Sequence, residues 1–157
     1  MSRRRRAVSR KIEKDPIYGS ELVTKIINIL QIEGNRDTAE RKFYAAMEVI
    51  KNRISGKSEL EVLEKAISNI KPALEVKSRR VGGATYQVPI EVRDVRQKSL
   101  AIRWLLTFAR KRNERGIENQ VASEIIDAYN NTGGAVRKKE EVLRIAESNR
   151  AFAHYRW

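Results

Sequence analysis

Clusters of arginine and lysine are the residues in this chain whose type and spacing could do chemistry. Residues 1–14 carry seven Lys or Arg and one acid, Lys77–Arg80 adds three cations, and residues 93–115 carry eight cations against two acids. The formal net charge of the 157-residue chain is +13, so the remainder is close to neutral. Charge gathered in this way is typical of a protein that binds a polyanion, and we expect that polyanion to be nucleic acid.

The basic N-terminus contains four consecutive arginines and no apolar pattern of a helix or strand. Such a segment cannot bury a core, so it is either a solvated tail or an arm that becomes ordered along a phosphate backbone. The planar guanidinium binds phosphate through two hydrogen bonds, which favours the second interpretation. The residues expected to contact phosphate here are Arg3, Arg4, Arg5, Arg6, Arg10 and Lys11.

Three further groups of cations have both a structural and a nucleic-acid interpretation. Cations at the end of a helix near residue 110 would stabilise the helix by roughly a few tenths of a kcal/mol through its dipole. Four cations are more than this compensation requires, which favours a patch that binds a phosphate backbone. Cations expected in the first turn of the last helix oppose its dipole, which favours an external anion. A hairpin face with Lys77, Arg79 and Tyr86 could be an ordinary sheet face, or it could bind phosphate and stack on an unpaired base. The phosphate contacts expected from these groups, together with Arg96 and Arg103 of the basic stretch 93–115, are Lys77, Arg79, Arg80, Arg110, Lys111, Arg112, Arg115, Arg137, Lys138 and Lys139.

No constellation of residues suggests catalysis. His154 is the only histidine and cysteine is absent, so a His-pair metal site, a thiolate site and a catalytic triad have no candidates. Gly82-Gly83 and Gly133-Gly134 lack the spacing of phosphate-binding loops and indicate turns. No apolar run approaches the roughly 18 residues of a membrane span. We therefore expect a binding protein without a cofactor, a metal or a membrane partner.

Hydrophobic spacing predicts a mainly α fold of about six helices. Apolar residues recur at i, i+1, i+4, i+5 and i+8 from Leu22 and again from Val121, which is one face of a helix. The pair Asp37 and Glu40 is spaced as a capping pair and predicts the start of the second helix. The last helix is expected from Val136 to about Ser148.

The hydrophobic period changes to two over residues 74–92, which predicts a β-hairpin turning at Gly82-Gly83. This register pairs Arg79 with Tyr86. Pro89 cannot donate to a ladder, which suits an exposed edge. A lone hairpin is marginal in water, so we expect it to protrude and to be steadied by a partner.

Length and pattern together predict one domain. Residues 1–14 are expected to form a flexible basic arm, and residues 15–157 a single bundle-like helical RNA-binding domain that carries the hairpin.

Three stretches of the chain resemble the bacterial-type small-subunit ribosomal protein seven family. They are Asp15-Pro16-Ile17-Tyr18-Gly19-Ser20, the hairpin run from Glu75 to Pro89, and the ending Ala151-Phe152-Ala153-His154-Tyr155-Arg156-Trp157. The resemblance runs through the whole chain in the same order, and it includes the Arg-rich start.

The resemblance implies a six-helix fold with a protruding hairpin and a primary RNA-binding function. Such a protein would nucleate folding of the 3′ major (head) domain of small-subunit ribosomal RNA in the cytoplasmic ribosome. It would lie near the exit-site tRNA and the mRNA path, with ribosomal proteins nine and eleven of the small subunit as neighbours.

The family's functional positions match residues of this chain. The arm, the hairpin cations and the basic start of the last helix match positions that contact RNA. Arg79, Gly82, Gly83 and Tyr86 match the ribbon that reaches toward tRNA. One departure occurs where the family usually has Gly-Lys-Lys and this chain has Gly34-Asn35-Arg36. Arg36 keeps one of the two expected cations, and Asn35 lacks the other.

Two other interpretations stay open at this level. A DNA-binding protein of helix-turn-helix or architectural type fits the charge and the helices, but no helix shows an evident base-reading face and a simple helix-turn-helix lacks a hairpin. An enzyme acting on nucleic acid would need clustered acids for a metal, or a nucleophile beside a base, and neither is visible.

Overall fold

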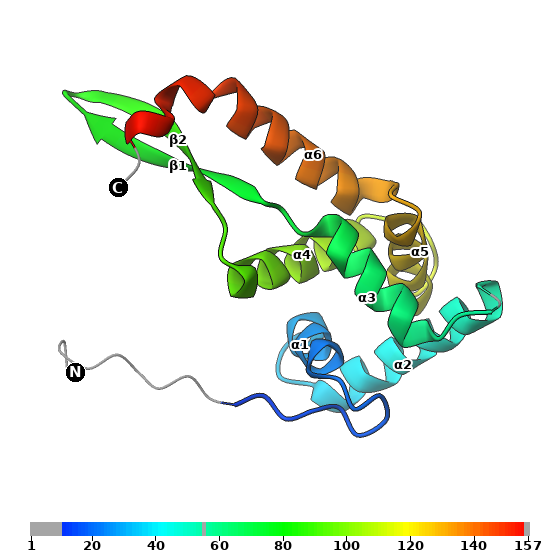
Figure 1. Cartoon of the computed structure of the whole chain (residues 1–157). Coiled ribbons are helices and arrows are strands. Elements are labelled where there is room, and N and C mark those ends of the chain that lie inside the picture. Colours follow the sequence, from blue (N-terminus) through cyan, green and yellow to red (C-terminus); the bar gives the residue numbers. More distant parts are fainter. Residues whose placement is uncertain (1–10, 55, 156–157) are drawn as a thin grey trace, which may run out of the picture.

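The computed structural model describes residues 11–54 and 56–155 (Figure 1). Across these ranges it contains six α-helices, one short 3₁₀ helix and a two-stranded antiparallel hairpin, which confirms the predicted fold class. The elements in chain order are α1 (Glu21–Leu30), α2 (Arg36–Arg53), α3 (Glu59–Ile70), β1 (Leu74–Val81), β2 (Ala84–Glu91), α4 (Asp94–Ala109), α5 (Ile117–Tyr129), α6 (Gly133–Ser148) and η1 (Arg150–Tyr155). No helix among the described residues has the length and apolar character of a membrane span.

Short polar side chains begin three of the helices. Ser20 Oγ accepts from the backbone N–H of Leu22, and Ser58 Oγ accepts from that of Glu61 at 3.2 Å, so both serines act as N-caps. The prediction that Asp37 and Glu40 cap the start of α2 is wrong. Asn35 fills that position through its Oδ1, since asparagine caps a helix as well as aspartate does.

Helix α5 is the centre of the helical body. It packs against α2, α3, α4 and α6, and its buried residues include Val121 and Ile125. Phe43 of α2, Leu63 of α3 and Leu105 of α4 are fully buried in the same apolar core. The core therefore fixes the directions of the helices whose outer faces carry the cations.

The hairpin has the predicted register, with Arg79 opposite Tyr86, and it turns at two exposed glycines. Gly82 and Gly83 both have positive φ, 57° and 89°, as a tight two-residue hairpin turn requires. In Figure 1 the hairpin extends away from the helical body, with α6 beside it and η1 near its outer part. Pro89 is buried, so the prediction of an exposed edge there is wrong. Helix α6 and η1 both pack against the hairpin.

Helix α6 begins three residues earlier than predicted, at Gly133. Its start has no side-chain cap of its own; instead the backbone N–H of Ala135 donates to Oε1 of Glu124 on α5 at 2.9 Å. Gly134 is necessary there, since a Cβ at this residue would lie 2.6 Å from a ring carbon of Phe108. A cap supplied from another helix leaves no signature in the local sequence.

Candidate nucleic-acid interface

One exposed face of α4 carries a regular line of arginines. Arg96, Arg103 and Arg110 follow one another at seven-residue intervals, almost two helical turns, so they share a face and lie about 10 Å apart along the axis. All three are exposed, as are Ser99 and Thr107 between them. The buried residues of α4, such as Leu105 and Ala109, occupy the opposite side. We call this line the α4 stripe.

The three arginines of the α4 stripe differ in what they contact. Arg96 Nε donates to both carboxylate oxygens of Glu75 on β1, at 2.8 and 3.0 Å, which ties the stripe to the base of the hairpin. Arg110 Nη2 donates to the backbone oxygen of Leu30 at 3.1 Å. Arg103 has no hydrogen-bond or ion-pair partner within the described part of the chain. Its guanidinium can therefore bind a phosphate without breaking an existing contact.

The predicted basic and aromatic face of the hairpin is covered by the C-terminal segment. The ring of Tyr86 lies 5.1 Å from that of Phe152 and 5.2 Å from that of Tyr155, centroid to centroid. Arg79 Nη1 donates to the backbone oxygen of Tyr155. Tyr86 is half-buried, and its stacking on an unpaired base stays a prediction for a ring that already has two aromatic neighbours.

The outer part of the opposite face of the hairpin is open, whereas Pro89 on the same face is buried nearer the base. The outer part carries Arg80 and three polar residues, all exposed: Ser78, Thr85 and Gln87. Lys77 lies on the covered face but near the base of the hairpin, where its side chain is exposed. The hairpin thus offers two exposed cations, on opposite faces, and a polar ribbon.

Arg112, just after α4, belongs to a network of carboxylates. Its Nε donates to Oε2 of Glu124 at 2.7 Å, and its other nitrogens contact Asp127 and Glu114. Burial alone would lower the pKa of Arg112, but the hydrogen bonds to Asp127 and Glu124 outweigh it and raise that pKa above the usual arginine value. Glu124 is only 1% exposed and also caps α6, so Arg112 balances a buried charge. The sequence did not reveal the role of Glu124, because Glu124 lies among the core positions of its helix and no local motif marks it as a cap or an ion-pair partner.

The other cations of this turn face outward. Lys111 is exposed, with its Nζ 5.3 Å from the centre of the Phe108 ring, and Arg115 is exposed as well. Neither forms an ion pair within residues 11–54 and 56–155. Of the four cations expected here as a single patch, the structure thus places Arg110 on the α4 stripe and Arg112 in an internal network.

The three cations of α6 lie in three different environments. Arg137 is exposed and has no partner among the described residues, Lys138 pairs with Glu141 at 2.9 Å, and Lys139 donates to the backbone oxygen of Asn69 at 2.7 Å. Because α6 begins at Gly133, these cations lie after the first turn, so the expected conflict with the helix dipole is largely absent. Arg137 and Lys111 border the same depression beside Phe108.

The N-terminal part of the predicted interface lies mostly outside the described residues. Arg3, Arg4, Arg5, Arg6 and Arg10 are all in that part of the chain, while Lys11 is described and exposed. Arg36 pairs with Glu40 at 2.6 Å, and this hydrogen bond raises the pKa of the guanidinium. Asn35, which stands where a cation was expected, uses its side-chain oxygen to cap α2.

A buried carboxylate anchors the segment before α1. Asp15 is 4% exposed and accepts hydrogen bonds from the backbone N–H groups of Ile17 and Tyr18 and from the Tyr44 hydroxyl at 2.7 Å. Burial first, and then this hydrogen bond, raise the pKa of Tyr44 well above the usual tyrosine value. An Asp-Pro pair ahead of a helix is the sequence signal for such a turn.

No group of three or more His, Cys, Asp or Glu suited to a metal ion occurs in the described part of the chain. The exposed cations of the α4 stripe, the hairpin and α6 are instead groups that can neutralise an anionic polymer. The chemistry that they offer is binding through guanidinium and ammonium groups.

Comparison with known proteins identifies the family that the chain resembles. The model of the family described as ribosomal protein S7p/S5e matches residues 2–150. The chain is 54% identical over 155 residues to the small ribosomal subunit protein uS7 of a Nitratiruptor species, covering 99% of each chain. It is 53% identical over 157 residues to the protein of the same name from Natranaerobius thermophilus, covering both chains fully. The corresponding protein of Sulfurimonas denitrificans is 55% identical over 155 residues, 99% of each chain.

Proposed function

The chain belongs to the ribosomal protein S7p/S5e family, and from that membership we propose that it is the primary RNA-binding protein that nucleates folding of the 3′ major domain of small-subunit ribosomal RNA. As a member of this family it is a structural constituent of the small subunit in the cytoplasmic ribosome, and not an enzyme. The protein then acts by holding segments of ribosomal RNA in position.

The observation that carries the proposal is the α4 stripe beside the hairpin. Arg103 is exposed with no described partner, and Arg96 pairs with Glu75 at the base of the hairpin, where Lys77 and Arg96 border the same depression. Cations on such a surface neutralise backbone phosphates where RNA helices converge, which lowers the repulsion between those helices. Specificity follows from the shape of the RNA and from exposed bases, since the deep A-form major groove is closed to side chains.

We further propose that the hairpin lies near the exit-site tRNA and the mRNA path. Support comes from its extension beyond the helical body and from the open polar face with Arg80 (Figure 1). Ribosomal proteins nine and eleven of the small subunit are the proposed protein neighbours, and the resemblance of the hairpin and C-terminal motifs to the family is the support for them. Residues 15–157 are proposed to act as one RNA-binding domain, with residues 1–14 as its arm.

A salt titration of binding to a transcript of the 3′ major domain tests the main proposal. We expect a log–log salt slope steeper than about −4, which corresponds to about six neutralised phosphates. We also expect at least a hundredfold preference over a shuffled RNA and over duplex DNA of equal length. Equal affinity for duplex DNA would favour a DNA-binding protein instead, and a steep slope without preference would leave only a general polyanion binder.

A further inference from the structure

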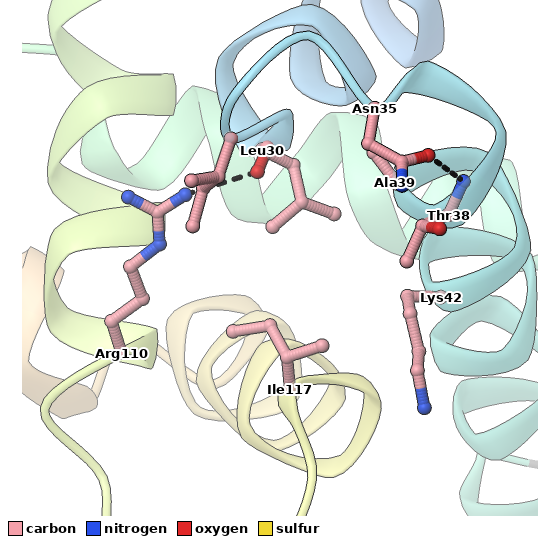
Figure 2. A pocket seen from close by; sticks show the side chains of 8 residues that line it. Leu30, Asn35, Thr38, Ala39, Lys42, Arg110 and Ile117 are labelled. Atoms are coloured by element: carbon pink, nitrogen blue, oxygen red, sulfur yellow. Dashed lines mark hydrogen bonds between the residues drawn. The ribbon is translucent and has the colours of Figure 1, made fainter.

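An apolar pocket lies where the end of α1 meets the starts of α2 and α5 and the end of α4 (Figure 2). Its volume is about 300 Å³, which is within the range of small-ligand sites. Leu30, Ala39 and Ile117 form apolar walls, and Ile32, at 61% exposure, also lines it. Figure 2 shows Leu30, Ala39 and Ile117 around a common opening, with Arg110 on one side and Lys42 on the other.

Hydrogen-bond donors surround this apolar surface. Arg110 Nη2 donates to the Leu30 oxygen at 3.1 Å, which holds the guanidinium at the wall, and its remaining N–H groups have no partner within the described residues. Asn35 Oδ1 accepts from Thr38 N–H, so Nδ2 of Asn35 is left as a donor without a described partner. Lys42 lies 3.2 Å from Glu118, which is not one of the lining residues.

We propose that this pocket receives an unstacked nucleobase of the bound RNA. A base offers flat apolar faces to aliphatic walls and to a guanidinium plane, and acceptor atoms at its edge to donors such as those of Arg110 and Asn35. The pocket deepens the proposed function and rests on it, because Arg110 is also the last residue of the α4 stripe. An RNA backbone that follows the stripe from Arg96 through Arg103 reaches the pocket at its end.

Charge complementarity favours a nucleotide over an apolar side chain of a protein. Insertion of an aliphatic group would remove water from Arg110 and Asn35 without replacing its hydrogen bonds, which is costly. A nucleotide instead supplies acceptors on the base and an anionic phosphate for Arg110, while Lys42 already pairs with Glu118. No carboxylate is found among the described residues that line the pocket.

Substitution of Ile32→Glu, with Ile17→Glu as matched control, tests the pocket in the full chain. The two isoleucines are 61% and 64% exposed, and of these two only Ile32 lines the pocket, so both variants change the net charge equally and both should fold. We expect Ile32→Glu to bind the 3′ major domain transcript about tenfold more weakly than Ile17→Glu, the loss of one base-stacking contact. Equal affinities of the two variants would overturn the proposal.

A direct measurement avoids dependence on a variant. The wild-type chain with ¹³C-labelled methyl groups is titrated with each of the four nucleoside monophosphates and, separately, with inorganic phosphate. Millimolar nucleotide should shift the methyl signals of Leu30, Ile32 and Ile117, and phosphate should not. Absence of shifts with all four nucleotides would overturn the proposal.

Crosslinking shows which macromolecule occupies the pocket. A benzophenone amino acid at position 32 should crosslink to ribosomal RNA in reconstituted subunits, whereas a crosslink to a protein alone would overturn the nucleobase assignment. Failure of the pocket and failure of the proposed function are distinguishable. Nucleotide-dependent methyl shifts without transcript preference would contradict only the ribosomal RNA function, and transcript preference without those shifts would contradict only the pocket.

Discussion

Arg103 and Arg112 lie nine residues apart, yet the structure gives them opposite surroundings. Arg103 stands on the exposed face of α4 with no described partner, while Arg112 contacts three carboxylates, one of them almost fully buried. An arginine side chain can therefore either remain available to bind an external anion, as Arg103 does, or stabilise the fold, as Arg112 does. Sequence position cannot distinguish the two cases, because the carboxylates that decide it come mainly from α5.

The largest expected effect is on folding, in an Arg112→Met variant. Removing the guanidinium leaves Glu124 buried and without its cation, which costs about 3–5 kcal/mol in the free energy of unfolding. Denaturant unfolding measures this cost. Arg103→Met, with the same change in charge, should shift that free energy by no more than about 0.5 kcal/mol. Similar losses in the two variants would remove the distinction between them.

RNA binding should show the reverse order. Arg103→Met is expected to weaken binding to the 3′ major domain transcript about five- to tenfold and to reduce the salt slope by about 1, because one phosphate contact is lost. Arg41→Met on α2 is the matched control, since Arg41 is exposed, pairs with Asp37 and is not part of the α4 stripe. If both variants bind alike, net charge rather than the stripe governs the affinity.

A smaller effect is expected at the hairpin. Phe152→Leu removes one of the two rings packed on Tyr86, and such aromatic pairs contribute about 0.5–1.5 kcal/mol beyond their buried area. Hydrogen exchange of the hairpin amides should accelerate, while amides of α5 should keep their protection. Unchanged exchange in β2 would mean that η1 does not steady the hairpin.

The smallest effect concerns tyrosine ionisation, where the neighbouring groups again determine the direction in which the pKa is shifted. Tyr44 beside Asp15 has a raised pKa, and Tyr129, whose hydroxyl accepts from Lys57, has a lowered one. Unfolded tyrosine ionises near pH 10. The stabilisation from Tyr44 is therefore complete below about pH 10 and is lost as the pH rises toward its higher folded pKa.

Spectrophotometric titration checks these directions. Tyr129→Phe should remove an early-ionising component, and Tyr44→Phe a late one. The alkaline decline in stability should also become shallower in Tyr44→Phe. A titration in which both variants lose the same component would contradict the assignment.

Local patterns in the sequence predicted much of the fold. Apolar spacing placed the helices, and the glycine pair placed the hairpin turn in its observed register, since both depend on neighbours in the chain. The start of α6 was missed because its capping oxygen belongs to Glu124 on another helix. The burial of Pro89 was missed as well, and the distant elements that pack on that hairpin leave no local pattern in the sequence.

The candidate interface was predicted as a set of cations and not as a surface. The seven-residue spacing of Arg96, Arg103 and Arg110 was visible in the sequence, because a helix alone determines which residues share a face. The internal use of Arg112 and the cover over Tyr86 depend on tertiary contacts. Charge counts alone cannot show which guanidinium groups the fold has already occupied.

The contact between Arg79 and Tyr155 has a consequence for the order of events during synthesis. The two residues are 76 positions apart in the chain. At elongation rates of about 5–20 residues per second, the hairpin is made roughly 4–15 s before the segment that covers it. During that interval the Tyr86 face has no aromatic neighbours from η1, so a nascent chain exposes a surface that the finished protein encloses.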